Sequence, residues 1–426
     1  MLKSCAITAL AGLMHSQSAL AADQTDLQIW IRASPDSRKV YEAIAERYKA
    51  KTGTKIEYFN TITDFEQRLA RAAAGNDLPD VVFDDASLLG QFVQMGIVDK
   101  IDRTKVVGGN DLSAAAWESA RGTDGNYYSV PTSAQAFALF IRKDWREKLK
   151  LPVPKTWADL EAMARAFTER DPDGNGKADT YGFIVPGSTN RGYTSWFLSA
   201  YVWQAGGEFV KPSGQGFRAG LDGSAAAALK MVRGMMCNKH TQPGAINATT
   251  ADANPAFRSG QAGMYFTGPY AFVPYDKEPG KDKYEVVAPP AGPKSSITLA
   301  EGTSAYIMKA SKKKAQAKSF LEFMISPEGQ TLGMTAPGQP VVRLPVNTKV
   351  DINKVLKDER WGLINQLYVK NSRYVNKVPN WTAIRQISAD GFNKALASCT
   401  SDIDTELAIT NTKINDELAR QKVLAQ

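Results

Sequence analysis

Histidine and cysteine are scarce in this chain. Its 426 residues include only two histidines, His15 and His240, and three cysteines. Since His15 lies in a segment that we expect to be removed, His240 is left alone, in a polar Asn-Lys-His-Thr stretch that we expect to face solvent. This scarcity argues against a Ser-His-Asp or Cys-His arrangement built on another histidine and against any multi-histidine metal centre.

Other features are missing as well. No stretch beyond the first residues approaches the roughly 18 consecutive apolar residues of a membrane span, and no glycine-rich loop has the pattern that cradles phosphate. The formal net charge is +8, or +7 without Lys3, and no Lys/Arg cluster is dense enough to indicate nucleic-acid binding. We attribute the positive excess to surface solubility, with an acidic ligand as the alternative.

The first 21 residues are typical of an export signal. Lys3 gives a basic start, Cys5–Met14 a modest apolar core, and Ala19-Leu20-Ala21 a small-x-small cleavage site before Ala22. Cys5 lies at the very start of the apolar core, far before the cleavage site, so it is not placed to become a lipid-anchored first residue. We expect residues 1–21 to be a signal peptide and the mature protein to be periplasmic.

Composition and pattern predict a large α/β protein. With 43% apolar and 23% charged residues, the chain can bury an extensive core, and its length indicates about two domains. Strand-like apolar runs at 27–31, 55–59 and 81–83 alternate with helix-like segments. This order predicts a parallel sheet with helices on its faces.

Polar residues follow each of these three strands, and they are Arg32, Ser34, Asn60, Asp84 and Asp85. Because the carboxyl ends of parallel strands share one edge of a sheet, a ligand cleft is expected there. Helix caps, turns and solvated loop charges are the alternative explanation for each residue. Asp84 and Asp85 also suggest the acid pair of a glycosidase, but adjacent strand residues point to opposite faces. A secreted polysaccharide-degrading enzyme is therefore a minor alternative.

The segment FRSGQAGMYFTGPY, residues 257–270, reads as a helix end, a buried strand and a turn. Gly260 suits the left-handed residue that closes a helix, and Met264-Tyr265-Phe266 is an apolar run between glycines. The turn then presents the ring of Tyr270 just past the end of the strand, where open α/β sheets place their ligands.

Together with this segment, four others carry a family resemblance. They are YYSVPTSAQAFALFIRKDW (127–145), KTWADL (155–160), WFLSAYVWQAGGEF (196–209) and GTSAYIMKASKKKAQAKSFLEFMISPEGQ (302–330). Their order along nearly the whole mature chain resembles that of the extracellular solute-binding proteins of ABC importers, in the sugar-binding, maltose-binding-protein-like branch.

This resemblance implies an α/β fold of the periplasmic-binding-protein type II, with two lobes joined by hinge crossings. The first lobe would comprise residues 22–130 and 297–344, and the second lobe residues 131–296 and 345–426 with the C-terminal helices. It implies a monomer without enzymatic activity that binds a mono- or oligosaccharide reversibly between closing lobes. The membrane subunits of an ABC permease would then receive the sugar.

Aromatic rings supply the argument for sugar, because the C–H faces of a pyranose pack on rings while its hydroxyls need fixed polar groups. The candidate walls are Trp196, Tyr270 and Trp381, with Tyr193 as a further one. Thr303 on the first lobe and Arg343 near a later crossing are candidate polar contacts. Burial in the core is the alternative for each ring.

An anionic ligand on the same fold is a second hypothesis. A uronic-acid oligosaccharide or a phosphorylated polyol would make charge-assisted hydrogen bonds with Arg32, Arg191 and Arg343.

The segment DPDGNGKADTYG, residues 171–182, resembles a calcium-binding loop. Asp171, Asp173, Asn175 and Asp179 occupy positions 1, 3, 5 and 9, and Lys177 can offer its carbonyl at position 7. Position 12 is glycine instead of a bidentate glutamate. The segment is either a structural Ca²⁺ site completed from elsewhere or by water, or an acidic surface turn.

After loss of the leader, Cys237 and Cys399 are the remaining cysteines. In an oxidising compartment, two cysteines suggest one disulfide, and two buried free thiols are the alternative.

Overall fold

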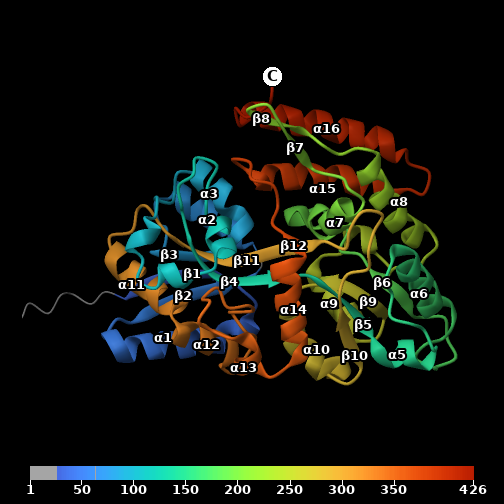
Figure 1. The fold of residues 1–426 in the computed structure, drawn as a ribbon, viewed down its shortest axis with the longest axis horizontal. Coiled ribbons are helices and arrows are strands. Elements are labelled where there is room, and N and C mark those ends of the chain that lie inside the picture. The colour runs from blue at the N-terminus through green and yellow to red at the C-terminus, as the bar shows by residue number, and fades with distance from the viewer. Residues whose placement is uncertain (1–25, 63) are drawn as a thin grey trace, which may run out of the picture.

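The computed structural model describes residues 26–62 and 64–426, which form a six-stranded and a four-stranded β-sheet covered by helices, together with a small two-stranded β-sheet. In Figure 1 the elements of the first sheet lie to the left and those of the second to the right, with α14 (Glu359–Lys370) between them. The expected signal peptide lies outside the described residues. None of the described helices has the length and apolar character needed to cross a membrane.

The first sheet begins with β1 (Leu27–Arg32), β2 (Ile56–Thr61) and β3 (Val81–Asp85). Both β2 and β3 pair with β1 in parallel, as the alternation of strands and helices predicts. Helix α1 (Arg38–Thr52) buries one apolar face and ends at Gly53, whose φ of 76° needs a residue without a Cβ. All three strand ends therefore meet at one edge.

The chain leaves and re-enters this sheet more than once. Strand β4 (Val130–Ala136) pairs with β11 (Thr298–Ile307), which lies antiparallel to β3. Strand β5 (Ala138–Arg142) then belongs to the second sheet, so the first crossing is at Phe137, while the expected boundary at 130–131 falls at the start of β4. The expected boundary at 296–297 immediately precedes β11.

The second sheet has the order β10-β5-β9-β6, in which β10 is Tyr284–Val287 and β6 is Tyr181–Ile184. Its core strand β9 (Ala262–Thr267) is buried throughout and contains the predicted Met264-Tyr265-Phe266 run. The preceding helix α9 (Thr250–Arg258) is followed by Gly260 at φ 76°, and the turn at Pro269–Ala271 positions Tyr270, as expected.

The C-terminal segment returns to the second lobe. Helix α15 (Trp381–Ala397) packs against α7 (Tyr193–Gln204), α8 (Gly223–Cys237) and α16 (Ile403–Arg420). Figure 1 shows α15 and α16 stacked above α7. The short strand β12 (Ser372–Arg373) adds to β11 of the first sheet before this return.

The remaining strands and helices complete the two lobes. They are α2 (Phe65–Ala74), α3 (Leu89–Gln94), α4 (Ala114–Ser119), α5 (Lys143–Lys148), α6 (Trp157–Glu169), β6 (Tyr181–Ile184), β7 (Val210–Ser213), β8 (Gly216–Ala219), α10 (Phe272–Tyr275), β10 (Tyr284–Val287), α11 (Lys314–Ile325), α12 (Pro327–Thr335) and α13 (Ile352–Leu356).

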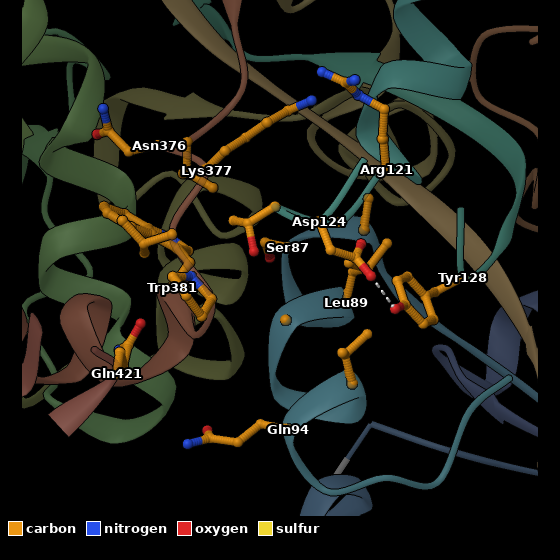
Figure 2. A pocket seen from close by; sticks show the side chains of 18 of the residues that line it. Ser87, Leu89, Gln94, Arg121, Asp124, Tyr128, Asn376, Lys377, Trp381 and Gln421 are labelled. Atoms are coloured by element: carbon orange, nitrogen blue, oxygen red, sulfur yellow. Dashed lines mark hydrogen bonds between the residues drawn. The ribbon is translucent and has the colours of Figure 1, made fainter. Parts of the chain in front are cut away.

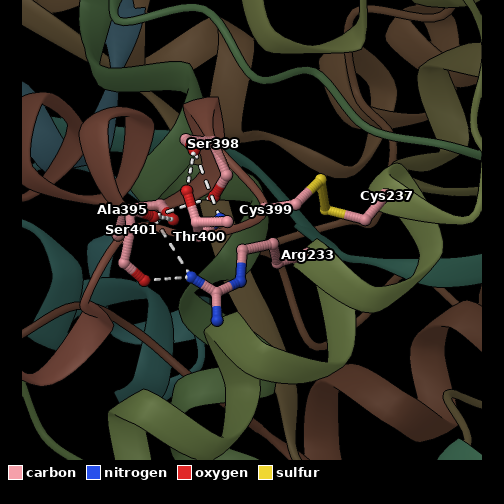
Figure 3. Close-up of a disulfide and its surroundings, with 7 residues drawn as sticks. All are labelled: Arg233, Cys237, Ala395, Ser398, Cys399, Thr400 and Ser401. Carbon is pink, nitrogen blue, oxygen red and sulfur yellow. Dashed lines mark hydrogen bonds between the residues drawn. A yellow bond between two sulfur atoms is a disulfide. The ribbon is translucent and has the colours of Figure 1, made fainter.

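A disulfide links Cys237, at the end of α8, to Cys399, just after α15 (Figure 3). Arg233, one turn before Cys237, donates to the Ser401 carbonyl and fastens the same two segments. The pairing that two cysteines suggested is thus the one that the structure contains.

The expectation that His240 faces solvent is wrong, since only 8% of the residue is exposed. Its carbonyl accepts hydrogen bonds from the Gly182 and Phe183 amides, so residues 240–241 run beside β6 as part of the fold. A polar stretch is buried here because its backbone groups extend the sheet.

Candidate ligand-binding site

Charged side chains gather at the predicted strand ends of the first lobe. Nε of Arg32 lies 3.3 Å from the Glu66 carboxylate, and its Nη1 lies 3.6 Å from Asp85. Arg32 ends β1, Asp85 ends β3, and Glu66 is in the first turn of α2. Asp84 is only 1% exposed, and its Oδ1 accepts the Asp85 amide. Three elements therefore build one buried charged edge.

Arg191 brings the second lobe to this edge. It lies in the turn before α7 with φ 52°, a conformation uncommon for any residue except glycine. Its Nη2 donates to Asp85 over 3.3 Å and forms an ion pair with Glu66. An arginine of one lobe thus contacts two carboxylates of the other.

Two further arginines lie beside this cluster. Arg343 donates its amide to Ser133 of β4, and Arg385 is on α15 with only 3% of its surface exposed. Arg385 reaches Ser87 Oγ at a long 3.5 Å, and among the described residues neither guanidinium forms an ion pair. In each, Nε is buried without a hydrogen-bond partner in the described part of the chain.

Burial and neighbouring charges shift the pKa values of the acids in different directions. Burial and the neighbouring Asp85 and Glu66 carboxylates raise the pKa of Asp84 well above its usual value. Burial raises the pKa of Glu301, on β11, to about 7, and Asp85 adds to this effect. For Asp85, burial is outweighed by Arg32, Arg191 and Arg385, so its pKa is lowered. Asp85 is therefore the more readily ionised of the two neighbouring aspartates, and Glu301 is near its midpoint at neutral pH.

The guanidinium groups lie over the predicted aromatic walls. Cζ of Arg385 is 5.1 Å and Cζ of Arg191 5.9 Å from the ring centroid of Trp196, and Tyr193 stacks parallel to that ring at 6.3 Å. Arg343 lies 5.8 Å above Tyr270, whose hydroxyl accepts from Thr267. The rings and the cations form one site.

A cavity of about 360 Å³ adjoins this cluster, and Ser87 and Trp381 are among its lining residues (Figure 2). Figure 2 shows Asn376, Lys377, Trp381 and Gln421 on one side, facing Leu89, Asp124 and Tyr128 on the other. Trp381 is 4% exposed, its Nε1 has no partner in the described chain, and it lies one helical turn from Arg385.

The other predicted contact residues of the first lobe differ in how close they lie to the charged cluster. Thr303 pairs with Asp85 across β11 and β3, next to the cluster. Asn60 is half-buried at the end of β2, opposite Ile31. Ser34 accepts the Asp36 amide and caps a short turn, which is the structural alternative that its sequence position left open.

Sequence reasoning missed three members of the cluster, which are Glu66, Glu301 and Arg385. Glu301 is a lone carboxylate within the apolar strand TLAEGTSAYI, and that pattern was a usable signal. Arg385 follows Trp381 by four residues on one helix, and this spacing, which puts both on one face, was a second usable signal. Glu66 carried no such signal.

The predicted calcium loop is closed by its own hydrogen bonds. The Asp171 carboxylate accepts amides of Gly174, Asn175 and Gly176, while Nδ2 of Asn175 donates to Asp173 and Asp179. The amide of Lys177 binds Asn175 Oδ1. In the described residues no group of three or more Asp, Glu, His or Cys side chains is arranged to hold a metal ion. This arrangement does not fit a bound ion unless the Asn175 amide turns.

Two α/β lobes with crossings between them and polar groups from both lobes in one buried site define a two-lobed binding protein. A family model for bacterial extracellular solute-binding proteins matches residues 33–331. The chain belongs to this family.

Known proteins agree with this assignment. A Brucella abortus (strain 2308) protein described as a binding protein is 25% identical over 402 residues, covering 89% of this chain and 91% of the relative. The acarbose receptor GacH of Streptomyces glaucescens GLA.O has a TM-score of 0.79 at 20% identity, covering 94% of this chain and 98% of the receptor. A tagatose-bound solute-binding protein of an ABC transporter from Thermotoga lettingae TMO has a TM-score of 0.81 at 19% identity, covering 92% and 99%. The predicted type II fold is confirmed.

Proposed function

We propose that this chain is the periplasmic substrate-binding component of an ABC importer and carries a mono- or oligosaccharide between its two lobes. The observation that carries the proposal is the contact of Arg191 from the second lobe with Glu66 and Asp85 of the first. Ligands of hinged binding proteins lie where polar groups of both lobes converge, because closure then completes the site.

The chemistry of the site supports a carbohydrate. Trp381 gives the cavity an aromatic wall, Trp196 and Tyr270 lie at the charged cluster, and buried donors beside these rings are available for hydroxyl groups. The two proteins with the same fold that are named for acarbose and tagatose support this class of ligand.

Reversible binding is proposed in place of catalysis. Glu66 and Asp85 are engaged by arginines, and the only histidine in the described part of the chain is built into the edge of the second sheet. The loaded protein would then deliver its sugar to the permease subunits.

Calorimetry and X-ray scattering with a panel of neutral, acidic and phosphorylated sugars test the proposal. We expect saturable binding of at least one sugar and a smaller radius of gyration in its presence. Scattering curves that stay identical with a bound sugar contradict lobe closure, and release of shortened oligosaccharides contradicts the absence of catalysis. Mass spectrometry of exported protein should find Ala22 as the first residue.

A further inference from the structure

Two arginines at the lobe interface lack a carboxylate partner in the described chain. Arg385 is 3% exposed and is held by one long hydrogen bond to Ser87. Arg343 makes no side-chain hydrogen bond or ion pair there and lies over the Tyr270 ring. By contrast, Arg32 and Arg191 both lie against Glu66 and Asp85.

The charges of the cluster do not balance. Four guanidinium groups face four acids, but Asp84 and Glu301 bind protons more tightly than usual because they are buried. Among the described residues, the carboxylates that form ion pairs in the cluster are Glu66 and Asp85, and both pair with Arg32 and Arg191 only. The interface therefore holds an excess of positive charge in a low-dielectric setting.

Stacking on aromatic rings does not offset this burial. A cation over an aromatic ring gains about 0.5–2 kcal/mol, whereas taking an ion out of water costs several kcal/mol when no opposite charge accompanies it. Arg385 and Arg343 have ring contacts at 5.1 and 5.8 Å, while the Asp85 carboxylate attracts both from beyond ion-pair distance. An oxyanion supplied by the ligand is the partner that both lack.

We infer that the ligand is an acidic carbohydrate, whose carboxylate or phosphate oxygens accept hydrogen bonds from Arg343 and Arg385. This inference rests on the proposed carbohydrate-binding function and narrows its substrate class. Planar guanidinium groups match both oxyanions, so the shared chemistry is a negatively charged group on a sugar or polyol. The cavity of about 360 Å³ beyond Ser87 adds room for a further unit, beside the ring of Trp381.

Calorimetry with matched neutral and acidic probes tests the inference. The probes are trigalacturonate and trimannuronate, their methyl esters, which keep the shape but lose the charge, and sorbitol 6-phosphate. We expect at least one acidic probe to bind about 10-fold or more tightly than any neutral one, with an affinity that falls as salt is raised. Tightest binding of a uronate identifies a carboxylate, and tightest binding of sorbitol 6-phosphate identifies a phosphate.

Two outcomes overturn the inference and are distinguishable. Equal or tighter binding of the methyl esters or of neutral sugars overturns the acidic ligand but leaves carbohydrate binding intact. Absence of binding by every sugar and polyol, acidic or neutral, overturns the proposed function as well.

Variants connect the charge preference to the two arginines. Arg343→Gln and Arg385→Gln should each lower the affinity for the acidic probe about 10- to 100-fold, and each should leave the affinity for its methyl ester nearly unchanged. Arg233→Gln, beside the disulfide, is the control and should alter neither affinity. If Arg385→Gln does not fold, Arg385→Lys keeps the charge and removes the planar fork. If both variants lose affinity equally for the acidic probe and for its methyl ester, the assignment of Arg343 and Arg385 as the anion-binding residues is contradicted.

Discussion

Arg191, in the turn before α7, donates a hydrogen bond to the Asp85 carboxylate at the end of β3 over 3.3 Å. The two residues belong to different lobes and are both largely buried, with side chains 13% and 16% exposed. A buried charge pair is weak support for stability in general, but breaking it leaves an unpaired charge. Because the pair joins the two lobes, its loss would leave a buried charge of one lobe without its partner in the other.

Arg191→Ala should weaken ligand binding by at least about 10-fold, because closure would then bury Asp85 and Glu66 with one cation fewer. Calorimetry measures the affinity, and scattering measures the extent of closure. Arg38→Ala, in an exposed pair with Glu42, is the matched control and should change neither. An unaltered affinity for Arg191→Ala would show that this contact is incidental to closure.

Local sequence patterns predicted the strand ends of this site. An apolar strand and the polar residue that follows it lie within a few positions of each other, so a short stretch of sequence is enough to identify both. The run LQIWI became β1 with Arg32 at its end, and VVF became β3 with Asp85 at its end. What meets those ends depends on contacts between distant segments. Arg385 approaches Ser87 across nearly 300 residues of chain, a sequence separation of 298, and no periodicity reports such a meeting.

Sequence patterns also left open how deeply each candidate side chain is buried. Trp196 lies beside the charged cluster and Trp381 lines the cavity, yet both are nearly buried, and Trp196 lies under two guanidinium groups. Ser34 lies in the same loop as Arg32 but caps a turn. Whether a polar residue faces a ligand or its own backbone depends on local geometry of a few ångströms, which composition does not encode.

Because of Glu301, the free energy of unfolding should decrease as the pH rises. Its pKa is about 7 in the folded protein against 4.5 for an ordinary glutamate, because the carboxyl is buried. Between these values the folded protein binds more protons than the unfolded chain, so unfolding free energy decreases through this window and levels off above it.

Glu301→Gln removes this group while keeping an oxygen for the Gly302 amide. Urea unfolding at about pH 5 and about pH 8 should show a decrease that is about 2 kcal/mol smaller for the variant than for the parent protein. Glu46→Gln, at an exposed position, should follow the parent. A variant that loses stability with pH as steeply as the parent would refute the assignment.

Tyr270→Ala should reduce ligand affinity by about 10-fold or more, because it removes the ring below Arg343 at the predicted site. Trp157→Ala is the comparison, since Trp157 is buried away from the cluster and donates to Gln204. That variant should lower the unfolding free energy by about 3–5 kcal/mol and leave the affinity of the folded fraction unchanged. If Trp157→Ala lowers the affinity more than Tyr270→Ala does, the ligand cleft lies elsewhere.

The disulfide should stabilise the second lobe without affecting the ligand. Replacing Cys237 and Cys399 together by alanine should lower the unfolding free energy by about 2–5 kcal/mol, because the bond closes a loop with a sequence separation of 162. Arg385 lies about 18 Å along α15 from its end, so affinity should stay unchanged. Thiol counting on exported protein should find no free cysteine, and two free thiols would contradict the bond.

Calcium binding by loop 171–179 remains a proposal with a definite structural requirement. The carboxylates of Asp173 and Asp179 both accept from Nδ2 of Asn175, so they already converge on one small group. A half-turn of that amide would present Oδ1 beside these oxygens, and a cation would then take the place of the N–H donors. Calcium is therefore expected to raise the melting temperature, and EDTA to reverse the rise. Asp173→Asn with Asp179→Asn should abolish the response and leave sugar affinity intact. A melting temperature that is the same in calcium and in EDTA would identify the segment as an acidic turn held by its own hydrogen bonds.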